Sequence, residues 1–586
     1  MFHRVFKPFR LSGLVFVLIL SACTSHAETL SPVNTTGNVA LNRGSMTQPA
    51  TSTPFQPSSS EPQSSPTPQP SLSSEGNLMV WVDSAVPGVL RNVLSGKAGV
   101  AMAASPQGAN LQLLPQTKDD QGSEALQVIQ WVYALTAPFN TVTDGITSSD
   151  LRAAWQGQPP GPFGDSPILM DSSTLAVFRA LWGQPAEGAV AVLPADQLLD
   201  YAWQHAPAWA ILPFEELGPR WKVLTVDGQS PLHRDFDAGK YALAARFVLK
   251  GAPEVAARLQ NALGLASDAA ILPATNRDPG KLTVLVMTGV TALVRATAAK
   301  MEQRGIDYPA QDIGAWLRDA DLTHISNEVP FDPNCPKPDP LQATLQFCSD
   351  PAYIKLLQDV GTDIVELTGN HLEDYGPDAA LYTLNLYKQE GWKTYGGGAN
   401  LAQSRQPALV EHNGNRLAFL GCNPVGPASD WATDSQPGST PCDYALMESQ
   451  IADLRASGYL PIVTFQYNEY YQFAPSETQV RDFHAMAKAG AVIVSGSQAH
   501  FPQAMGFLGD SFIHYGLGNL FFDQMDYPVV GTRREFIDRH VFYDGRYIGT
   551  ELLTAMLEDY ARPRPMTPAE RQSLLQDVFA VSDWAR

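Results

Sequence analysis

From residue 282 onward, short apolar strands alternate with helical segments, and this alternation limits the possible folds more than any other feature of the sequence. The pattern predicts strands at 282–287, 323–326, 364–367, 417–421, 461–465, 491–494 and 512–515, and helices at 291–304, 354–360, 379–390 and 480–489. Strands and helices in alternation are typical of an α/β fold. The C-terminal part of this region differs, because its pattern predicts a β-hairpin with strands at 536–543 and 547–557 and a tight turn at Asp544-Gly545.

A second α/β region precedes this one, at 77–278, with a break at 276–280. Strands are expected at 78–82, 190–193 and 209–212, and a helix is expected after Ser149 as its N-cap. Segments 149–157, 211–215 and 223–227 resemble the substrate-binding proteins of ABC transporters, which implies a periplasmic-binding-protein-like α/β domain with a small ligand. The alternative is a structural α/β domain without a ligand.

The first 22 residues have the pattern of a lipoprotein signal peptide. Three cations precede an apolar run at 11–20, and the run ends in Leu20-Ser21-Ala22-Cys23. The run is shorter than the roughly 20 residues that a membrane span needs. Cys23 is therefore the expected lipidation site, which would place the exported protein on the outer face of the cytoplasmic membrane. The alternative is an ordinary cleaved signal with an incidental cysteine.

Residues 23–76 are rich in Ser, Thr and Pro, so we expect a disordered tether there. The four remaining cysteines are an even number in an exported chain, where disulfides persist. Pairing between sequence neighbours predicts the disulfides Cys335–Cys348 and Cys422–Cys442. Zinc binding is the rival interpretation, but no Cys-x-x-Cys spacing occurs.

The chain is acidic, with 39 Lys and Arg against 59 Asp and Glu and a net charge of −20. Loss of the signal peptide removes three cations and no anions, which gives 36 − 59 = −23. A chain without a net cationic field does not favour nucleic acid as a partner. The same charge means that an anionic polymer could be held only through a local basic patch or a bridging cation.

Four polar clusters follow predicted strands of the second region and form one candidate site. They are 326–328, 368–371 with Asp374, 466–469 and 496–500. Carboxylate, amide and imidazole groups that converge from several strands can bind a divalent ion, which can then activate water or polarise a phosphoryl oxygen. A glycine before Asn370-His371 would let the chain turn abruptly at the strand exit.

The order of these motifs resembles the CapA family, the capsule or poly-gamma-glutamate synthesis proteins related to calcineurin-like metallophosphoesterases. The resemblance covers residues 281–526 of a domain at 281–586 and is carried by the motifs Met287-Thr288-Gly289, Asn327-Glu328, Asn370-His371-x-x-Asp374-Tyr375-Gly376, 496–503 and 515–523. It implies a layered α-β-β-α metallophosphoesterase-like sandwich and a part in making, exporting or anchoring an anionic envelope polymer.

The departures from the family pattern concern its metal ligands. Val290 stands where the family has Asp, Gln466 stands where it has His, and Gly496 to His500 keeps only the last of three histidines. When the family's site residues are carried over one by one, the candidate ligands or acid/base groups that remain are Glu328, Asn370, His371 and His500, with Gln498 as a weak neutral ligand. A dinuclear site needs a bridging carboxylate and several imidazoles, so we expect either one divalent ion or none.

Two functions fit these residues. In the favoured one, the protein keeps the fold and cleft but binds or assembles an envelope polymer or its synthesis and export machinery. In the other, it is a mononuclear metal-dependent hydrolase of a phosphoester or of an amide or ester bond in an envelope polymer. Glu328 and His500 would then hold the ion, Asn370 would orient the reacting oxygen, and His371 would be the general acid or base.

Overall fold

The computed structural model describes residues 78–116, 125–164 and 166–584. The predicted signal peptide, Cys23 and the predicted tether lie outside these residues. Within the described part of the chain, no helix has both the length and the apolar character that crossing a membrane requires.

Residues 78–251 form a mixed ten-stranded sheet with helices packed on it, so the α/β prediction is confirmed. Its strands run in the order β2 (Val100–Met102), β1 (Leu78–Val82), β3 (Leu111–Pro115), β10 (Ala244–Gly251), β4 (Gln127–Pro138), β8 (Trp209–Pro213), β6 (Ile168–Met170) and β7 (Val190–Val192), and β9 (Trp221–Val226) joins β4 to β5 (Gly145–Ile146). The helices are α1 (Gly88–Leu94), α2 (Ser148–Trp155), α3 (Ser172–Trp182), α4 (Leu198–Gln204) and α5 (Pro253–Ala262).

One local prediction in this region is wrong. The N-cap of α2 is Thr147, whose side chain accepts from the backbone N–H of Asp150, and Ser149 lies inside the first turn. Thr147 has the extended backbone that an N-cap requires, so its hydroxyl reaches the exposed N–H groups of the helix start.

The second region contains two large sheets and a two-stranded one, β15 (Gly397–Gly398) with β18 (Gly438–Ser439). The eight-stranded sheet has the order β14 (Lys393–Tyr395), β13 (Ile364–Glu366), β12 (Leu322–Asn327), β11 (Leu282–Thr291), β24 (Arg534–Tyr543), β25 (Arg546–Glu558) and β26 (Arg562–Pro565), with β23 (Asn519–Phe521) paired to β11. The six-stranded sheet has the order β16 (Ala408–His412), β17 (Asn415–Cys422), β19 (Leu460–Gln466), β20 (Ile493–Ser497), β22 (Ser511–His514) and β21 (Met505–Leu508).

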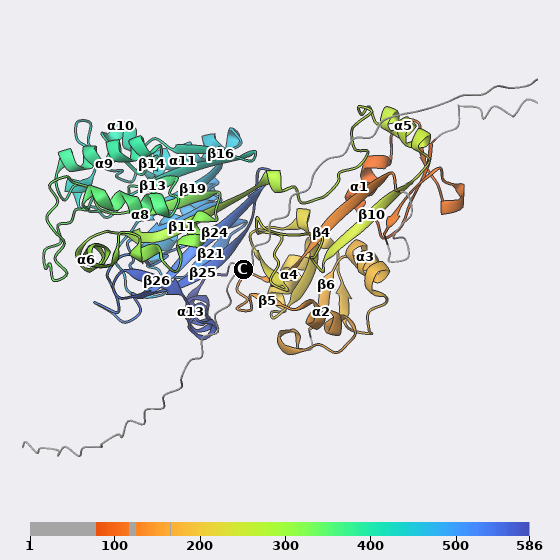
Figure 1. Cartoon of the computed structure of the whole chain (residues 1–586), viewed down its shortest axis with the longest axis horizontal. Helices are drawn as coiled ribbons and strands as arrows, with labels where there is room; N and C mark the ends of the chain where they lie inside the picture. The colour runs from red at the N-terminus through yellow and green to blue at the C-terminus, as the bar shows by residue number, and fades with distance from the viewer. Residues whose placement is uncertain (1–77, 117–124, 165, 585–586) are drawn as a thin grey trace, which may run out of the picture. The chain divides into compact units, whose positions relative to one another are not determined.

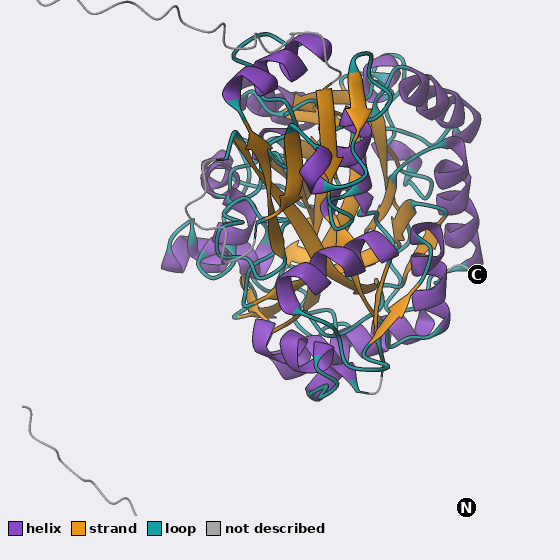
Figure 2. Ribbon diagram, turned by 90° about the vertical axis from the view of Figure 1, so that its right-hand side faces the viewer, coloured by secondary structure: helices purple, strands orange, loops and turns teal. Residues whose placement is uncertain are grey.

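Three buried clusters show that these sheets pack face to face with helices outside them. Leu285 and Met287 of β11 share one cluster with Phe419 and Ile462 of the other sheet. The outer face of the larger sheet is covered by α6 (Arg295–Arg304), α7 (Gly314–Arg318), α8 (Ile354–Asp359) and α9 (Pro377–Glu390). The outer face of the smaller sheet is covered by α11 (Tyr444–Ala456) and α12 (Glu477–Ala489). The predicted α-β-β-α sandwich is confirmed (Figures 1 and 2).

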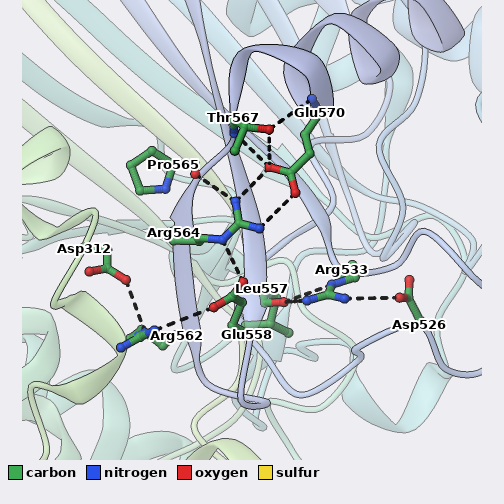
Figure 3. A network of polar contacts seen from close by, with 10 residues as sticks. All are labelled: Asp312, Asp526, Arg533, Leu557, Glu558, Arg562, Arg564, Pro565, Thr567 and Glu570. Carbon is green, nitrogen blue, oxygen red and sulfur yellow. Dashed lines mark hydrogen bonds and ion pairs between the residues drawn. The ribbon is translucent and has the colours of Figure 1, made fainter. Parts of the chain in front are cut away.

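The predicted hairpin is β24 and β25, with Asp544 and Gly545 in its turn at φ values of 51° and 75°. The chain then continues through β26 into α13 (Pro568–Val581). Arg564 of β26 forms a bidentate pair with Glu570, and Thr567 and Glu570 form a capping box at the start of α13 (Figure 3). These contacts fix the direction in which α13 leaves the sheet.

Both predicted disulfides are present, Cys335–Cys348 and Cys422–Cys442. The second joins the end of β17 to the segment before α11 and so closes the loop 423–441. The predicted domain boundary at 278–281 stays a prediction. One continuous buried cluster includes side chains of the ten-stranded sheet together with Leu282, Val541 and Ile548 of the second region.

Candidate functional site

The carboxyl ends of parallel strands from both sheets meet at one place and position the candidate site. In the larger sheet, β12 ends at Asn327 and β13 at Glu366, and in the smaller sheet β19 ends at Gln466 and β20 at Ser497. The hydroxyl oxygens of Ser326 and Ser497 lie 3.1 Å apart across the two sheets. The predicted convergence of the polar clusters is therefore found.

At this meeting point, three oxygen atoms surround the side-chain amide of Gln466. Its Nε2 donates to Oε1 of Glu328 (3.0 Å) and Oδ1 of Asn370 (2.9 Å), and it also contacts Oε1 of Gln498. Glu328, Gln466 and Gln498 are buried. An amide nitrogen has two hydrogens, so the three acceptors share them. The NH₂ group thus occupies a position where oxygen ligands converge.

Glycines let the backbones that carry these groups approach closely. A Cβ on Gly369 would lie 2.8 Å from Cα of Glu328, and one on Gly496 would lie 1.9 Å from the carbonyl oxygen of Tyr515. Gly369 is not among the positive-φ glycines of the described residues. The chain does turn at residues 370–375, as expected, and Gly369 is needed there for close packing against Glu328.

His371 faces a cavity of about 610 Å³ beside this oxygen cluster. Its Nδ1 lies 2.7 Å from Oδ2 of Asp374. Burial by itself lowers the pKa of His371, but the hydrogen bond that its Nδ1–H donates to Asp374 and the negative charges of Glu328, Asp374 and Asp430 outweigh it and raise that pKa. The imidazole is therefore held oriented and favours its protonated form.

Two acidic residues on the same cavity were not predicted from the sequence. Burial raises the pKa of Asp430 to about 7, assisted by the charge of Asp374, and burial together with Asp430 raises the pKa of Glu373 to about 7. Asp430 lies in the loop 423–441, so the pairing of Cys422 with Cys442 was the only sequence signal that placed this loop at the sheet edge. Glu373 lies within the recognised 370–376 motif.

His500 lies on the loop after β20, with Gln498, but its polar contact is with a different residue. Its Nδ1 is 2.8 Å from Oδ1 of Asn519, and its ring packs on Phe522 at 5.1 Å. Gln498 and His500 both have positive φ, 75° and 48°, a backbone state that is costly for residues with a side chain and is often kept at functional sites. No described hydrogen bond joins His500 to Glu328, Asn370 or Gln498.

The residues present do not fit a dinuclear metal site. Val290 is fully buried and offers no ligand, and the described residues contain no group of three or more His, Cys, Asp and Glu side chains suited to a metal ion. The converging donors are one carboxylate and amides, without a bridging carboxylate. The roles assigned to Glu328, Asn370, His371, Gln498 and His500 stay predictions.

Comparison with known proteins agrees with this architecture. Residues 284–524 match the family model described as bacterial capsule synthesis protein PGA_cap. These residues are similar to the capsule synthesis proteins of the CapA family.

The relatives of this region include "Capsule biosynthesis protein CapA" of Bacillus anthracis, at 27% identity over 334 residues, which are 55% of this chain and 79% of the relative. "PGA biosynthesis protein CapA" of Bacillus subtilis is 25% identical over 226 residues, 38% of this chain and 59% of the relative. A 5′-nucleotidase precursor from Thermus thermophilus is similar over 50% of this chain and 58% of its own, at 13% identity and a TM-score of 0.30. The resemblance of residues 77–278 to substrate-binding proteins stays a prediction.

Proposed function

We propose that this protein takes part in the synthesis, export or anchoring of an anionic capsule polymer at the cell envelope, and that its site binds or assembles polymer and partners without hydrolysing them. The process is supported by the family match and by the names of the relatives. We also propose that the protein is exported and lipid-anchored through Cys23.

The proposal that the site does not hydrolyse its ligand rests on the position of the Gln466 side-chain amide. Its Nε2 already satisfies the oxygens of Glu328 and Asn370 that would otherwise face a cation. A neutral donor there lowers the need for a metal ion, because a buried carboxylate with hydrogen-bond partners is less costly than one without.

Metal analysis of the full-length protein tests this. We expect wild type purified without chelators to hold much less than one divalent ion per chain. Gln466→His returns the imidazole of the family pattern and should raise the content toward one. Gln479→His, at a buried hydrogen-bonded glutamine of α12, is the matched control and should not. One tightly held ion per wild-type chain would overturn the proposal.

A second function, a mononuclear metal-dependent hydrolase, is favoured by the His371–Asp374 pair on the open cavity. Rotation of the Gln466 amide by half a turn would present Oε1 and complete a set of four oxygens with Glu328, Asn370 and Gln498, the kind of ligand that Mg²⁺ and Ca²⁺ prefer. A bound ion would supply Lewis-acid chemistry, and His371 would hold the proton that the leaving group takes.

Hydrolysis of p-nitrophenyl phosphate and release of new ends from poly-gamma-glutamate, each with added Mg²⁺ or Mn²⁺, separate the two functions. A metal-dependent rate that falls about 100-fold or more in His371→Ala would support the hydrolase. Equal rates for wild type and His371→Ala, together with retained binding of poly-gamma-glutamate, would support the binding protein.

A further inference from the structure

A second cavity, of about 400 Å³, lies along β25 and shares no lining residue with the cavity beside His371. β26 pairs with β25 only over residues 555–558, and within the described chain no other strand pairs with that side of β25 at 550–554. The carbonyl oxygen of Leu552 accepts instead from Nη1 of Arg571 at 2.6 Å. The carbonyl oxygen of Thr554 accepts from the backbone N–H of Met566 at 3.0 Å. This side of β25, covered by Arg571 and Met566, forms a wall of the cavity.

Most of this wall is apolar and comes from separate elements. Phe139 lies just after β4, Leu552 is on β25, Met566 lies after β26, and Leu575 and Phe579 are on α13. The Arg564–Glu570 pair and the Thr567 capping box hold α13 in place (Figure 3). A preformed apolar cavity of this volume with a few charged groups has the usual properties of a small-molecule site.

The charged groups on the cavity do not cancel. Lys222, Arg539 and Arg571 carry three positive charges, and Asp144 and Glu551 carry two negative ones, which leaves 3 − 2 = +1 before His233 is counted. Asp144 forms ion pairs with both Lys222 (2.7 Å) and Arg571 (2.6 Å). An unbalanced charge against an apolar wall is costly and favours an anion that neutralises it.

Arg539 is the cation with unused donors. Its Nε lies 3.6 Å from Oε2 of Glu551, its cross-strand neighbour, which is an ion pair but too long for a hydrogen bond. This Nε is buried and has no hydrogen-bond partner among the described residues. Glu551 is held through Oε1 by Nε2 of His233 at 2.9 Å, whereas its Oε2, which faces Arg539, is buried without a hydrogen-bond partner among the described residues. A guanidinium with free donors suits a carboxylate or phosphate group.

We propose that this cavity binds a small amphipathic anion, with its single carboxylate or phosphate head on Arg539 and its apolar body between β25 and α13. The site is independent of the proposed function at Gln466.

The test uses the full-length protein and the fluorescent fatty acid 11-(dansylamino)undecanoate. We expect a saturable rise in dansyl emission that dodecanoate or dodecyl phosphate reverses, whereas dodecanol is much weaker. The stronger of the two anions identifies the head group. Arg539→Met should weaken the binding of dodecanoate about 10- to 100-fold, as expected for loss of a charge-assisted hydrogen bond. Arg416→Met, at a partly exposed arginine that does not line this cavity, should not.

Met566→Trp, which fills the cavity from its rim, should abolish binding, whereas Leu409→Trp on the exposed face of β16 should not. Circular dichroism verifies that each variant is folded. No saturable emission in wild type, or equal affinity in wild type, Arg539→Met and Met566→Trp, would overturn the proposal. Equal affinity for dodecanol and dodecanoate would overturn the role of Arg539.

Discussion

Nε2 of Gln466 lies 3.0 Å from Oε1 of Glu328, so a neutral amide holds a buried carboxylate at the point where the two sheets meet. Gln466→Leu removes this donor and the contacts to Asn370 and Gln498 together. We expect the free energy of unfolding to fall by about 3 kcal/mol in metal-free buffer, because a buried charged acceptor loses its partner. Urea denaturation measures this.

Gln466→Glu is the informative comparison, because it places a second carboxylate beside Glu328. This variant should be destabilised without metal and should regain stability with millimolar Ca²⁺ or Mg²⁺, which bind oxygen ligands. If Gln466→Leu has the same urea midpoint of unfolding as the wild type, the Gln466 amide does not stabilise the buried carboxylate of Glu328.

Gly369→Ala tests the close approach between the segment after β13 and Glu328. The added Cβ would lie 2.8 Å from Cα of Glu328, so the backbone must move. We expect a loss of about 1 to 3 kcal/mol, typical of overpacking. The control is Gly88→Ala, where a Cβ meets no atom within 4 Å. Equal unfolding midpoints for the two variants would contradict the role given to Gly369.

The sequence predicted those parts of the fold that local pattern decides. The strands and helices of the second region, the Asp544-Gly545 hairpin and both disulfides agree with the structure. Helix α6 begins at Arg295 and not at residue 291, because β11 continues to Thr291 through pairing with β12 and β23. That pairing joins residues far apart in the sequence, which local periodicity cannot report.

The candidate site was predictable only in part, for the same reason. Glu328, Asn370 and Gln498 were recognised by motif, and they converge. The three-way contact of Gln466 depends on the register of both sheets and on the rotamer of one amide. Asp430 reaches the cavity from a loop that has no motif of its own.

The disulfide Cys422–Cys442 should stabilise the loop that carries Asp430. It closes a segment with a sequence separation of 20, for which the chain-entropy relation gives about 3 kcal/mol. The double variant Cys422→Ala and Cys442→Ala should have a lower urea midpoint than the oxidised wild type. Reductant should lower the midpoint of the wild type by breaking this disulfide, an effect that the double variant cannot show. An unchanged midpoint would show that the fold does not depend on this closure.

Stability should fall as the pH rises from 5 to 8, because of the carboxyl groups beside His371. The folded-state pKa of Asp430 is about 7, and so is that of Glu373, whereas both titrate near 4 when unfolded. The folded protein therefore binds these protons more tightly, so their stabilisation is complete below about pH 4 and is lost as the pH passes 7. The raised pKa of His371 acts in the same direction, since its stabilisation is present below about 6.5 and is lost above its folded-state value.

Asp430→Asn cannot ionise, so the fall in unfolding free energy between pH 5 and 8 should be smaller than in wild type by about 2 kcal/mol, a value reduced for screening by solvent in the cavity. Urea denaturation at pH 5, 6, 7 and 8 measures the slope. Asp434→Asn, at an exposed position of the same loop, is the control and should keep the wild-type slope. Parallel slopes for the two variants would mean that Asp430 titrates near its ordinary pKa, and the cavity beside His371 would then carry a full negative charge at neutral pH.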